Sequence, residues 1–129
     1  MKIINSNKAP NALGPYSQGI YLENGFLFLS GQIAIDPKSN ALVEKDITLQ
    51  TKMVLKNIKE ILNEACFSIN DVVKTTIFLT DLNNFAFVNT LYQDFFENHK
   101  PARSCVEVSR LPKDALIEIE VIAYSSKKA

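Results

Sequence analysis

The most regular pattern in the chain lies in Pro101-Ala102-Arg103-Ser104-Cys105-Val106-Glu107-Val108 and, after a turn at residues 111–114, in Leu116-Ile117-Glu118-Ile119-Glu120-Val121-Ile122-Ala123. Both stretches alternate with period two, which is typical of half-buried β-strands. The first stretch puts Arg103, Cys105 and Glu107 on one face. The second puts Glu118 and Glu120 opposite a row of apolar residues. One face of each expected strand therefore carries charge.

Arg103 and Glu118 are the charged residues with the clearest chemical use. A guanidinium group is a planar fork of donors that suits a carboxylate ligand, and a carboxylate held nearby exchanges protons with water. Spacing alone also allows a structural role, in which Arg103, Glu107, Glu118 and Glu120 form a ladder of ion pairs on a solvated face. Most charged strand faces are surfaces of that kind, so the pattern by itself favours the ladder.

Length and composition indicate one compact domain spanning residues 1–129, because this length with 47% apolar content suffices for a single core. Lys plus Arg equals Asp plus Glu, at 14 each, and this balance disfavours nucleic acid as a partner. Residues 1–12 lack a leader pattern, and no run approaches the roughly 20 apolar residues of a membrane-spanning helix. A cytoplasmic protein without a membrane partner is expected.

The positions of the cysteines and the lack of known cofactor-binding motifs argue against a metal site or a bound cofactor. Cys66 and Cys105 fall in different contexts without metal-ligand spacing, so neither a disulfide nor a zinc site is expected. Cys66 is expected to be a buried, inert residue at a helix end. No phosphate-cradling glycine motif and no H-E-x-x-H motif occurs, which removes support for nucleotide cofactors and catalytic metals. His99, the only histidine, is given no catalytic role.

The first half of the chain predicts an edge strand at residues 2–4, an arm and a hairpin. The arm leads to Gly14-Pro15-Tyr16-Ser17-Gln18, where glycine and proline present Tyr16 from a rigid corner. The alternative for Tyr16 is a structural role, in which its ring packs against the protein and its hydroxyl group contacts solvent. Residues 19–23 and 26–35 are predicted to form strands, and Asn24-Gly25 between them is typical of a two-residue hairpin turn. Gly31, within Ser30-Gly31-Gln32, marks either a bulge or the close approach of another group.

The second half predicts two amphipathic helices separated by a β-branched strand at residues 72–80. Asp46 suits the N-cap of a helix over residues 47–65. The next helix starts at residues 81–83, with a core stripe of Phe85, Val88, Tyr92, Phe95 and Phe96. Asn89 lies one position off this stripe and faces either a neighbouring pocket or solvent, and the pattern favours solvent. The Lys127-Lys128 tail is expected to fray.

This order of elements predicts an α+β fold in which two helices cover one face of a mixed sheet. If the alternating apolar residues face the helices, the uncovered face carries both Arg103 and Glu118. Such a face is either solvated or buried in an oligomer.

These segments, in this order, resemble the RidA (YjgF) family of reactive-intermediate imine deaminases from end to end. The motifs that carry the resemblance are Gly14-Pro15-Tyr16-Ser17-Gln18, Ser30-Gly31-Gln32, Asp81-Leu82-Asn83 with Phe85 and Asn89, Pro101 to Val108, and Ile117-Glu118-Ile119-Glu120. The resemblance implies a chorismate-mutase-like fold, with a mixed six-stranded sheet and two helices on one face. It also implies a homotrimer around a central barrel, with active sites in clefts between subunits.

The implied reaction is the hydrolysis of 2-imino acids and their enamines, such as 2-aminoacrylate, 2-iminopropanoate and 2-iminobutanoate, to 2-keto acids and ammonia without any cofactor. Arg103 matches the arginine that holds the substrate carboxylate, and Glu118 matches the glutamate that positions or activates water. The remaining pocket residues match Tyr16, Ser30, Asn89 and Cys105. Cys105 is expected to line the pocket rather than attack the substrate, since no adjacent histidine supplies a base.

Two other functions stay open. The Arg103 pocket also suits a binding or regulatory module that senses a keto acid without turnover, although recognition of a carboxylate does not need Glu118. Ribonuclease or translation-inhibitor activity is reported for some members of the family, and the balanced charge and lack of a basic stripe disfavour it here.

Overall fold

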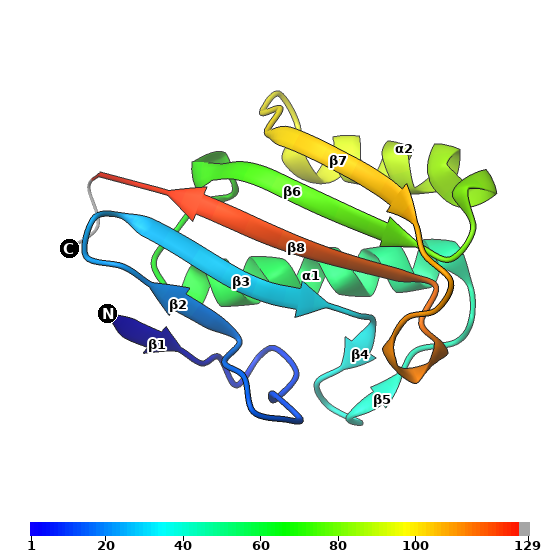
Figure 1. Cartoon of the computed structure of the whole chain (residues 1–129), viewed down its shortest axis with the longest axis horizontal. Coiled ribbons are helices and arrows are strands. Elements are labelled where there is room, and N and C mark those ends of the chain that lie inside the picture. The colour runs from blue at the N-terminus through cyan, green and yellow to red at the C-terminus, as the bar shows by residue number, and fades with distance from the viewer. Residues whose placement is uncertain (127–129) are drawn as a thin grey trace.

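The fold is a six-stranded sheet with two helices on one face, as the sequence predicted (Figure 1). The computed structural model describes residues 1–126, so the expectation for Lys127 and Lys128 lies outside the described residues. The sheet contains β1 (Lys2–Ile4), β2 (Gly19–Tyr21), β3 (Phe26–Gln32), β6 (Val72–Leu79), β7 (Ala102–Glu107) and β8 (Ile117–Tyr124). The helices are α1 (Ile47–Glu64) and α2 (Phe85–Phe96), and β4 (Ile35–Asp36) pairs with β5 (Ala41–Leu42) in a small ribbon that the sequence did not predict.

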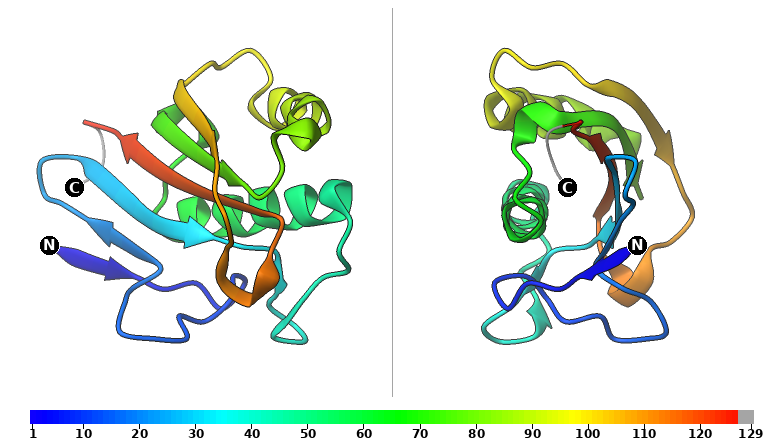
Figure 2. Two further views of the ribbon diagram at one scale, coloured as in Figure 1. Left: turned by 45° about the vertical axis from the view of Figure 1, so that its right-hand side comes forward. Right: turned by 90° about the vertical axis from the view of Figure 1, so that its left-hand side faces the viewer.

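The strand order β1-β2-β3-β8-β6-β7 makes the last strand of the chain a central one. β8 runs antiparallel to both β3 and β6, while β6 and β7 are parallel and are joined through α2. A helical crossover is the usual way to join two parallel neighbours. Both helices therefore lie on the same side of the sheet, as Figure 2 shows in its right-hand view.

The core fills the space between the sheet and α1. Ile117, Ile119 and Val121 of β8 are almost fully buried, as are Ile58 and Ile61 of α1. Burying each such side chain contributes roughly 2 kcal/mol to folding. The apolar face of β8, which follows from its period-two alternation, thus packs against the apolar face of α1, which follows from its helical spacing.

Helix α1 begins where the sequence predicted, but the environment of Cys66, which follows the helix, differs from the expectation. The Asp46 carboxylate accepts a hydrogen bond from the Leu49 N–H at 2.8 Å and so caps the helix. Beyond the helix, Cys66 has φ of +61° and is exposed. The expectation that Cys66 is buried is wrong, because this left-handed residue reverses the chain and leaves the thiol outside the core.

The β2–β3 hairpin is confirmed, but its turn has three residues instead of two. The Leu22 N–H donates to the Phe26 carbonyl at 2.8 Å, and the Gly25 N–H donates to the Leu22 carbonyl at 2.9 Å. Gly25 has φ of +107°, and an added Cβ would lie 2.9 Å from the Ser125 carbonyl oxygen. The glycine is therefore required at the last position of the turn.

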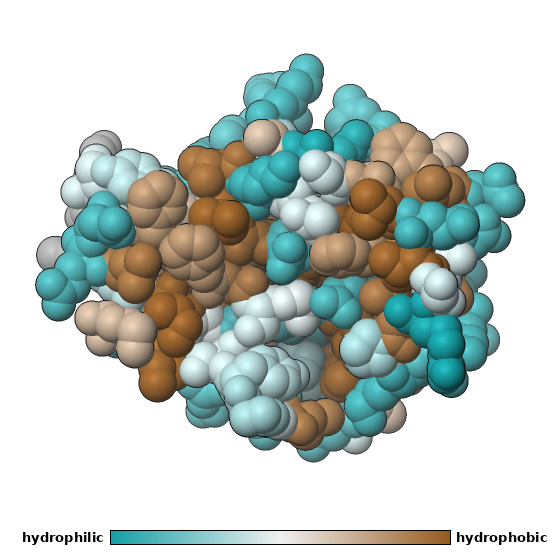
Figure 3. Space-filling view, in the orientation of Figure 1, coloured by the Kyte–Doolittle hydropathy of each residue, from teal (hydrophilic) through white to brown (hydrophobic). Residues whose placement is uncertain are grey.

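The other face of the sheet has no helix over it, and large apolar side chains lie on it. Ile3, Phe28, Val106 and Tyr124 are between 38% and 61% exposed there. Figure 3 views this uncovered face, where apolar surface gathers over the strands between polar residues. Neither helix of the described residues has the length and apolarity needed to cross a membrane.

Candidate functional site

Arg103 lies on the helix-covered face of the sheet. In the parallel pairing of β6 and β7 it stands beside Thr75, which is 1% exposed and points toward α2. Its guanidinium carbon is 5.3 Å from the ring centroid of Phe85 and 4.9 Å from that of Tyr92. Its Nη1 donates to the Asn89 Oδ1 at 2.8 Å. Three residues of α2 therefore contact the guanidinium.

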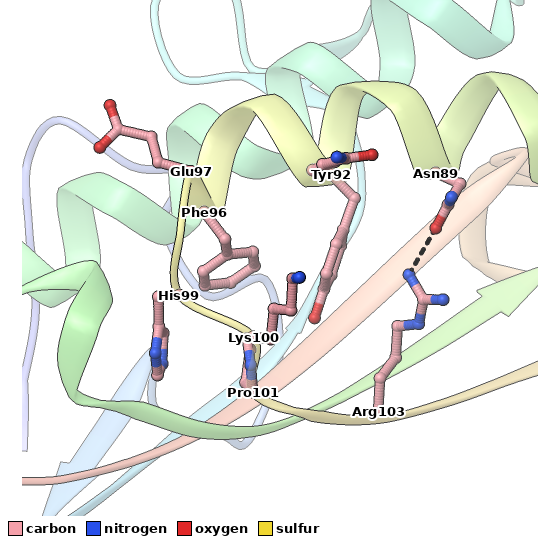
Figure 4. Close-up of a pocket in the computed structure, with 9 residues that line it drawn as sticks. Asn89, Tyr92, Phe96, Glu97, His99, Lys100, Pro101 and Arg103 are labelled. Atoms are coloured by element: carbon pink, nitrogen blue, oxygen red, sulfur yellow. Dashed lines mark hydrogen bonds between the residues drawn. The ribbon is translucent and has the colours of Figure 1, made fainter.

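A groove of about 490 Å³ opens next to this guanidinium, between α2 and the segment that enters β7 (Figure 4). Its walls are Asn89, Tyr92, Gln93, Phe96 and Glu97 from the helix side, and His99, Lys100, Pro101 and Arg103 from the strand side. Arg103 and Asn89 lie at one end of the row of side chains that Figure 4 draws. A small anion in the groove can therefore reach a positioned guanidinium.

Cys105 lies on the same face as Arg103, two residues further along β7, and is half-buried. Burial raises the pKa of its thiol, and the positive charge of Arg103 lowers the pKa by less. The thiol is therefore mainly protonated at neutral pH, which disfavours a nucleophilic role.

Glu118 lies on the opposite face of the sheet. It pairs with Phe78, while its neighbours Ile117 and Ile119 are buried against α1. Its half-buried carboxyl group lies against Gly31, where an added Cβ would overlap it. Burial and then the Glu120 carboxylate raise the pKa of Glu118. A carboxylate of raised pKa is a stronger base than an ordinary one.

The Ser30-Gly31 stretch is both a bulge and a place of close approach, so both expectations for it are confirmed. The pairing of β3 with β8 shifts between Leu29 and Gln32, which inserts one extra residue. The Ser30 hydroxyl donates to the Ser17 carbonyl at 2.6 Å, and the Ser30 N–H donates to the Gln18 carbonyl at 2.9 Å. The bulge beside Glu118 is thereby tied to the corner that carries Tyr16.

Tyr16 is 52% exposed, so the alternative of a packed aromatic ring is wrong. The corner itself is anchored by Gln18, which is buried. The Gln18 side chain accepts from the Ser6 N–H at 2.7 Å and donates to the Pro10 carbonyl at 2.8 Å. These bonds fasten the arm of residues 6–10 beneath the corner and leave the Tyr16 ring free to contact a ligand or a neighbouring surface.

The expectation that Arg103 and Glu118 share the uncovered face is wrong for Arg103. On β7, Val106 faces the open side and Arg103 faces the helix, the reverse of what burial by hydrophobicity suggests. The ladder of ion pairs is also excluded, because β6 lies between β7 and β8 and the two charged rows lie on opposite faces. The preference for a solvated Asn89 is wrong as well, since its amide oxygen binds Arg103.

Two residues that contact Arg103 were not among the predicted site residues. Phe85 and Tyr92 belong to the expected apolar stripe of α2, and both rings contact the guanidinium. A signal was present, because Phe85, Asn89 and Tyr92 follow one another at spacings of four and three residues. Such spacing puts side chains on one side of a helix.

Sequence comparison gives one family and well-covered relatives. The family model described as Endoribonuclease L-PSP matches residues 6–125. A RutC family protein of Pyrococcus abyssi is 56% identical over 123 residues, covering 95% of this chain and 96% of the relative. The 2-iminobutanoate/2-iminopropanoate deaminase of Salmonella typhimurium is 50% identical over 125 residues, covering 95% of this chain and 96% of the relative.

Solved structures agree with the fold over nearly the whole chain. Escherichia coli TdcF, solved with bound serine, has a TM-score of 0.93 and 45% identity, covering 98% of this chain and 100% of TdcF. A Yersinia pestis protein, YyfA, assigned to the conserved Rid family, has a TM-score of 0.94 and 53% identity, covering 96% of this chain and 98% of YyfA. This chain belongs to the RidA/YjgF family, which the Endoribonuclease L-PSP model describes and which includes imine deaminases.

Proposed function

We propose that this protein is a cytoplasmic 2-iminobutanoate/2-iminopropanoate deaminase, which hydrolyses reactive 2-imino acids and their enamines to 2-keto acids and ammonia. The proposal rests on one observation: a group that can bind a carboxylate and a group that can act as a base lie on opposite faces of the sheet. One face holds a guanidinium beside an open groove, and the other holds a half-buried carboxyl of raised pKa. The named activity of the Salmonella relative supports the same reaction.

In the proposed mechanism, Arg103 binds the substrate carboxylate through its N–H groups. The imine reacts with its nitrogen protonated, and Glu118 removes a proton from a water molecule as the water oxygen bonds to the imine carbon. The carbon–nitrogen π electrons move onto nitrogen, and the product of this step is a neutral carbinolamine. Protonated Glu118 then returns its proton to nitrogen, the carbon–nitrogen bond breaks, and ammonia leaves while the carbinolamine hydroxyl loses its proton to solvent and becomes the keto group. The imine carbon is already electrophilic, so orientation and proton transfer suffice without a cofactor.

The proposed active site lies between subunits of a homotrimer. Arg103 and Glu118 lie on opposite faces of one sheet, so a site that contains both needs Glu118 of a neighbouring copy. The uncovered apolar face, which includes Phe28 and Val106, offers the surface for such contacts. We propose that Asn89 and Cys105 line the pocket beside Arg103, and that Tyr16 and Ser30 line it beside Glu118.

Disappearance of the imine tests the reaction directly. A threonine dehydratase generates 2-iminobutanoate, and semicarbazide traps what remains after a fixed time. Wild-type protein should accelerate the loss, whereas Arg103→Ala and buffer should not. Arg103→Lys should also be impaired, because a point charge does not reproduce a two-pronged clamp. Equal loss in all samples would refute the deaminase.

Subunit mixing tests the shared site. Arg103→Ala and Glu118→Ala should each be inactive as pure oligomers. When the two variants are co-expressed in equal amounts, about a quarter of the sites should combine an intact Arg103 with an intact Glu118 from its neighbour. Recovery of about a quarter of wild-type activity is therefore expected. If the mixture stays inactive while mixed oligomers are demonstrated by mass spectrometry, the two residues do not act across an interface.

A binding or regulatory module is the second candidate, favoured by the likeness to TdcF, which was solved with bound serine. It predicts that 2-oxobutanoate binds at Arg103 without imine loss, and that Glu118→Ala leaves this binding intact. The imine assay and a binding titration on the same preparation separate the two candidates.

A further inference from the structure

The guanidinium of Arg103 is held in place before any ligand arrives. Two aromatic rings of α2 lie within the range of cation–π contacts, at 5.3 Å for Phe85 and 4.9 Å for Tyr92. Between them along the helix, Asn89 takes one N–H of the guanidinium at 2.8 Å. Arg103 is otherwise an exposed residue on an edge strand, where a long side chain has many rotamers to lose on binding.

Tyr92 is itself fixed from the sheet side. Its hydroxyl forms a hydrogen bond of 2.7 Å with the Thr75 hydroxyl, and both residues are buried. Thr75 stands directly beside Arg103 in the pairing of β6 with β7. The Tyr92 ring that contacts the guanidinium is therefore tied to the strand that neighbours the arginine.

We infer that Phe85 and Tyr92 are positioning residues for ligand binding, which present the free N–H groups of Arg103 toward the groove. This inference rests on the proposed function for its ligand, a 2-imino acid or its 2-keto product. Because Asn89 occupies one N–H and the two rings contact the guanidinium, the carboxylate bonds to the N–H groups that remain. A guanidinium that is already held by these contacts loses less entropy when it binds a ligand than a free one does, which strengthens binding.

Three substitutions test the two aromatic rings separately from the Tyr92 hydroxyl group. Tyr92→Leu and Phe85→Leu remove a ring and should each weaken binding of 2-oxobutanoate by roughly tenfold. Tyr92→Phe keeps the ring and should retain most of the affinity. Phe95→Leu is the matched control, since Phe95 lies on the same helix with its ring packed edge-on against Phe96 at 5.0 Å, and it should leave the affinity unchanged.

Calorimetric titration with 2-oxobutanoate gives Kd for each folded variant, and imine hydrolysis gives KM and kcat. A positioning role for ground-state binding raises KM with little change in kcat, whereas general loss of structure lowers the active fraction in all assays. Phe85 is half-buried near the start of α2, so Phe85→Leu keeps the test decisive if Tyr92→Leu does not fold.

Wild-type affinity in folded Tyr92→Leu or Phe85→Leu would overturn the inference, and so would an equal loss in Phe95→Leu. Failure of the wild-type protein to bind 2-oxobutanoate would overturn it too. If wild type binds 2-oxobutanoate with the expected variant pattern but does not hydrolyse the imine, the deaminase proposal fails and the positioning role stands.

Discussion

Replacement of Gly31 by alanine should inactivate the protein without unfolding it. An added Cβ at this position would overlap the Glu118 carboxylate. Gly25 is the glycine with positive φ among the described residues, so alanine at position 31 meets no backbone strain of that kind. The substitution therefore acts on one neighbour, the end of the Glu118 side chain.

The two consequences differ in size. Displacing the Glu118 side chain by about 30° from its rotamer costs about 0.5–1.5 kcal/mol, so the free energy of unfolding should fall by about that much. A catalytic group misplaced by about 1 Å loses about a hundredfold in rate, so kcat should fall by about that factor. Activity is expected to change far more than stability.

The assay combines urea unfolding with the semicarbazide trapping of 2-iminobutanoate. Gly19→Ala is the matched control, because an added Cβ there would meet the Phe28 carbonyl oxygen at 3.4 Å, an ordinary contact. The control should be near wild type in both measurements. Full activity of Gly31→Ala would refute the assignment of Glu118, and a parallel loss of stability and activity would refute the claim that only one side chain moves.

Three further predictions concern pH, buried polar groups and assembly. Because burial raises the pKa of Glu118, activity that needs its carboxylate should fall as pH falls through that raised pKa. In a dissociated chain, without a neighbouring guanidinium, the same shift gives stability that is present below the unfolded-state pKa and is lost as pH rises through the folded-state pKa. Glu118→Gln should therefore raise the urea midpoint of the dissociated chain at pH 7 but not at pH 4. Within residues 1–126 the buried Thr51 hydroxyl has no hydrogen-bond partner, so Thr51→Val should be neutral or stabilising in urea, whereas Asn57→Ala, which removes a 2.8 Å bond to the Ile35 carbonyl, should cost about 1–3 kcal/mol. Phe28→Lys should lower both oligomer mass in equilibrium sedimentation and imine hydrolysis, because it puts a charge on the apolar face.

The fold was predictable where local pattern and core position agree. Ile117, Ile119 and Val121 alternate with polar residues, and their strand is central, so the apolar side had to face a helix. The face of β7 was not predictable in this way. β7 is an edge strand covered by aromatic rings of α2, and such rings pack against a guanidinium as well as against aliphatic side chains. Hydrophobicity alone therefore does not decide which face of β7 turns toward the helix.

The geometry of the candidate site was not predictable from the sequence. Motifs identified Arg103 and Glu118, yet their separation depends on which strand lies between them, and a strand order with β6 between β7 and β8 leaves no local signature. The bulge at Ser30 was foreseen from a glycine, whereas the contact of Gly31 with Glu118 depends on pairing between distant segments.

The opposite placement of the two charges has an electrostatic consequence for the proposed trimer. Within one chain the sheet separates Arg103 from Glu118, and the pKa of Glu118 is raised by burial and by Glu120. In an empty intersubunit site, the guanidinium of the neighbouring copy would lower that pKa again. A bound substrate carboxylate neutralises the guanidinium, so Glu118 becomes a stronger base when there is an imine to hydrolyse. Substrate binding would thus move the acid limb of kcat to higher pH than the acid limb of kcat/KM.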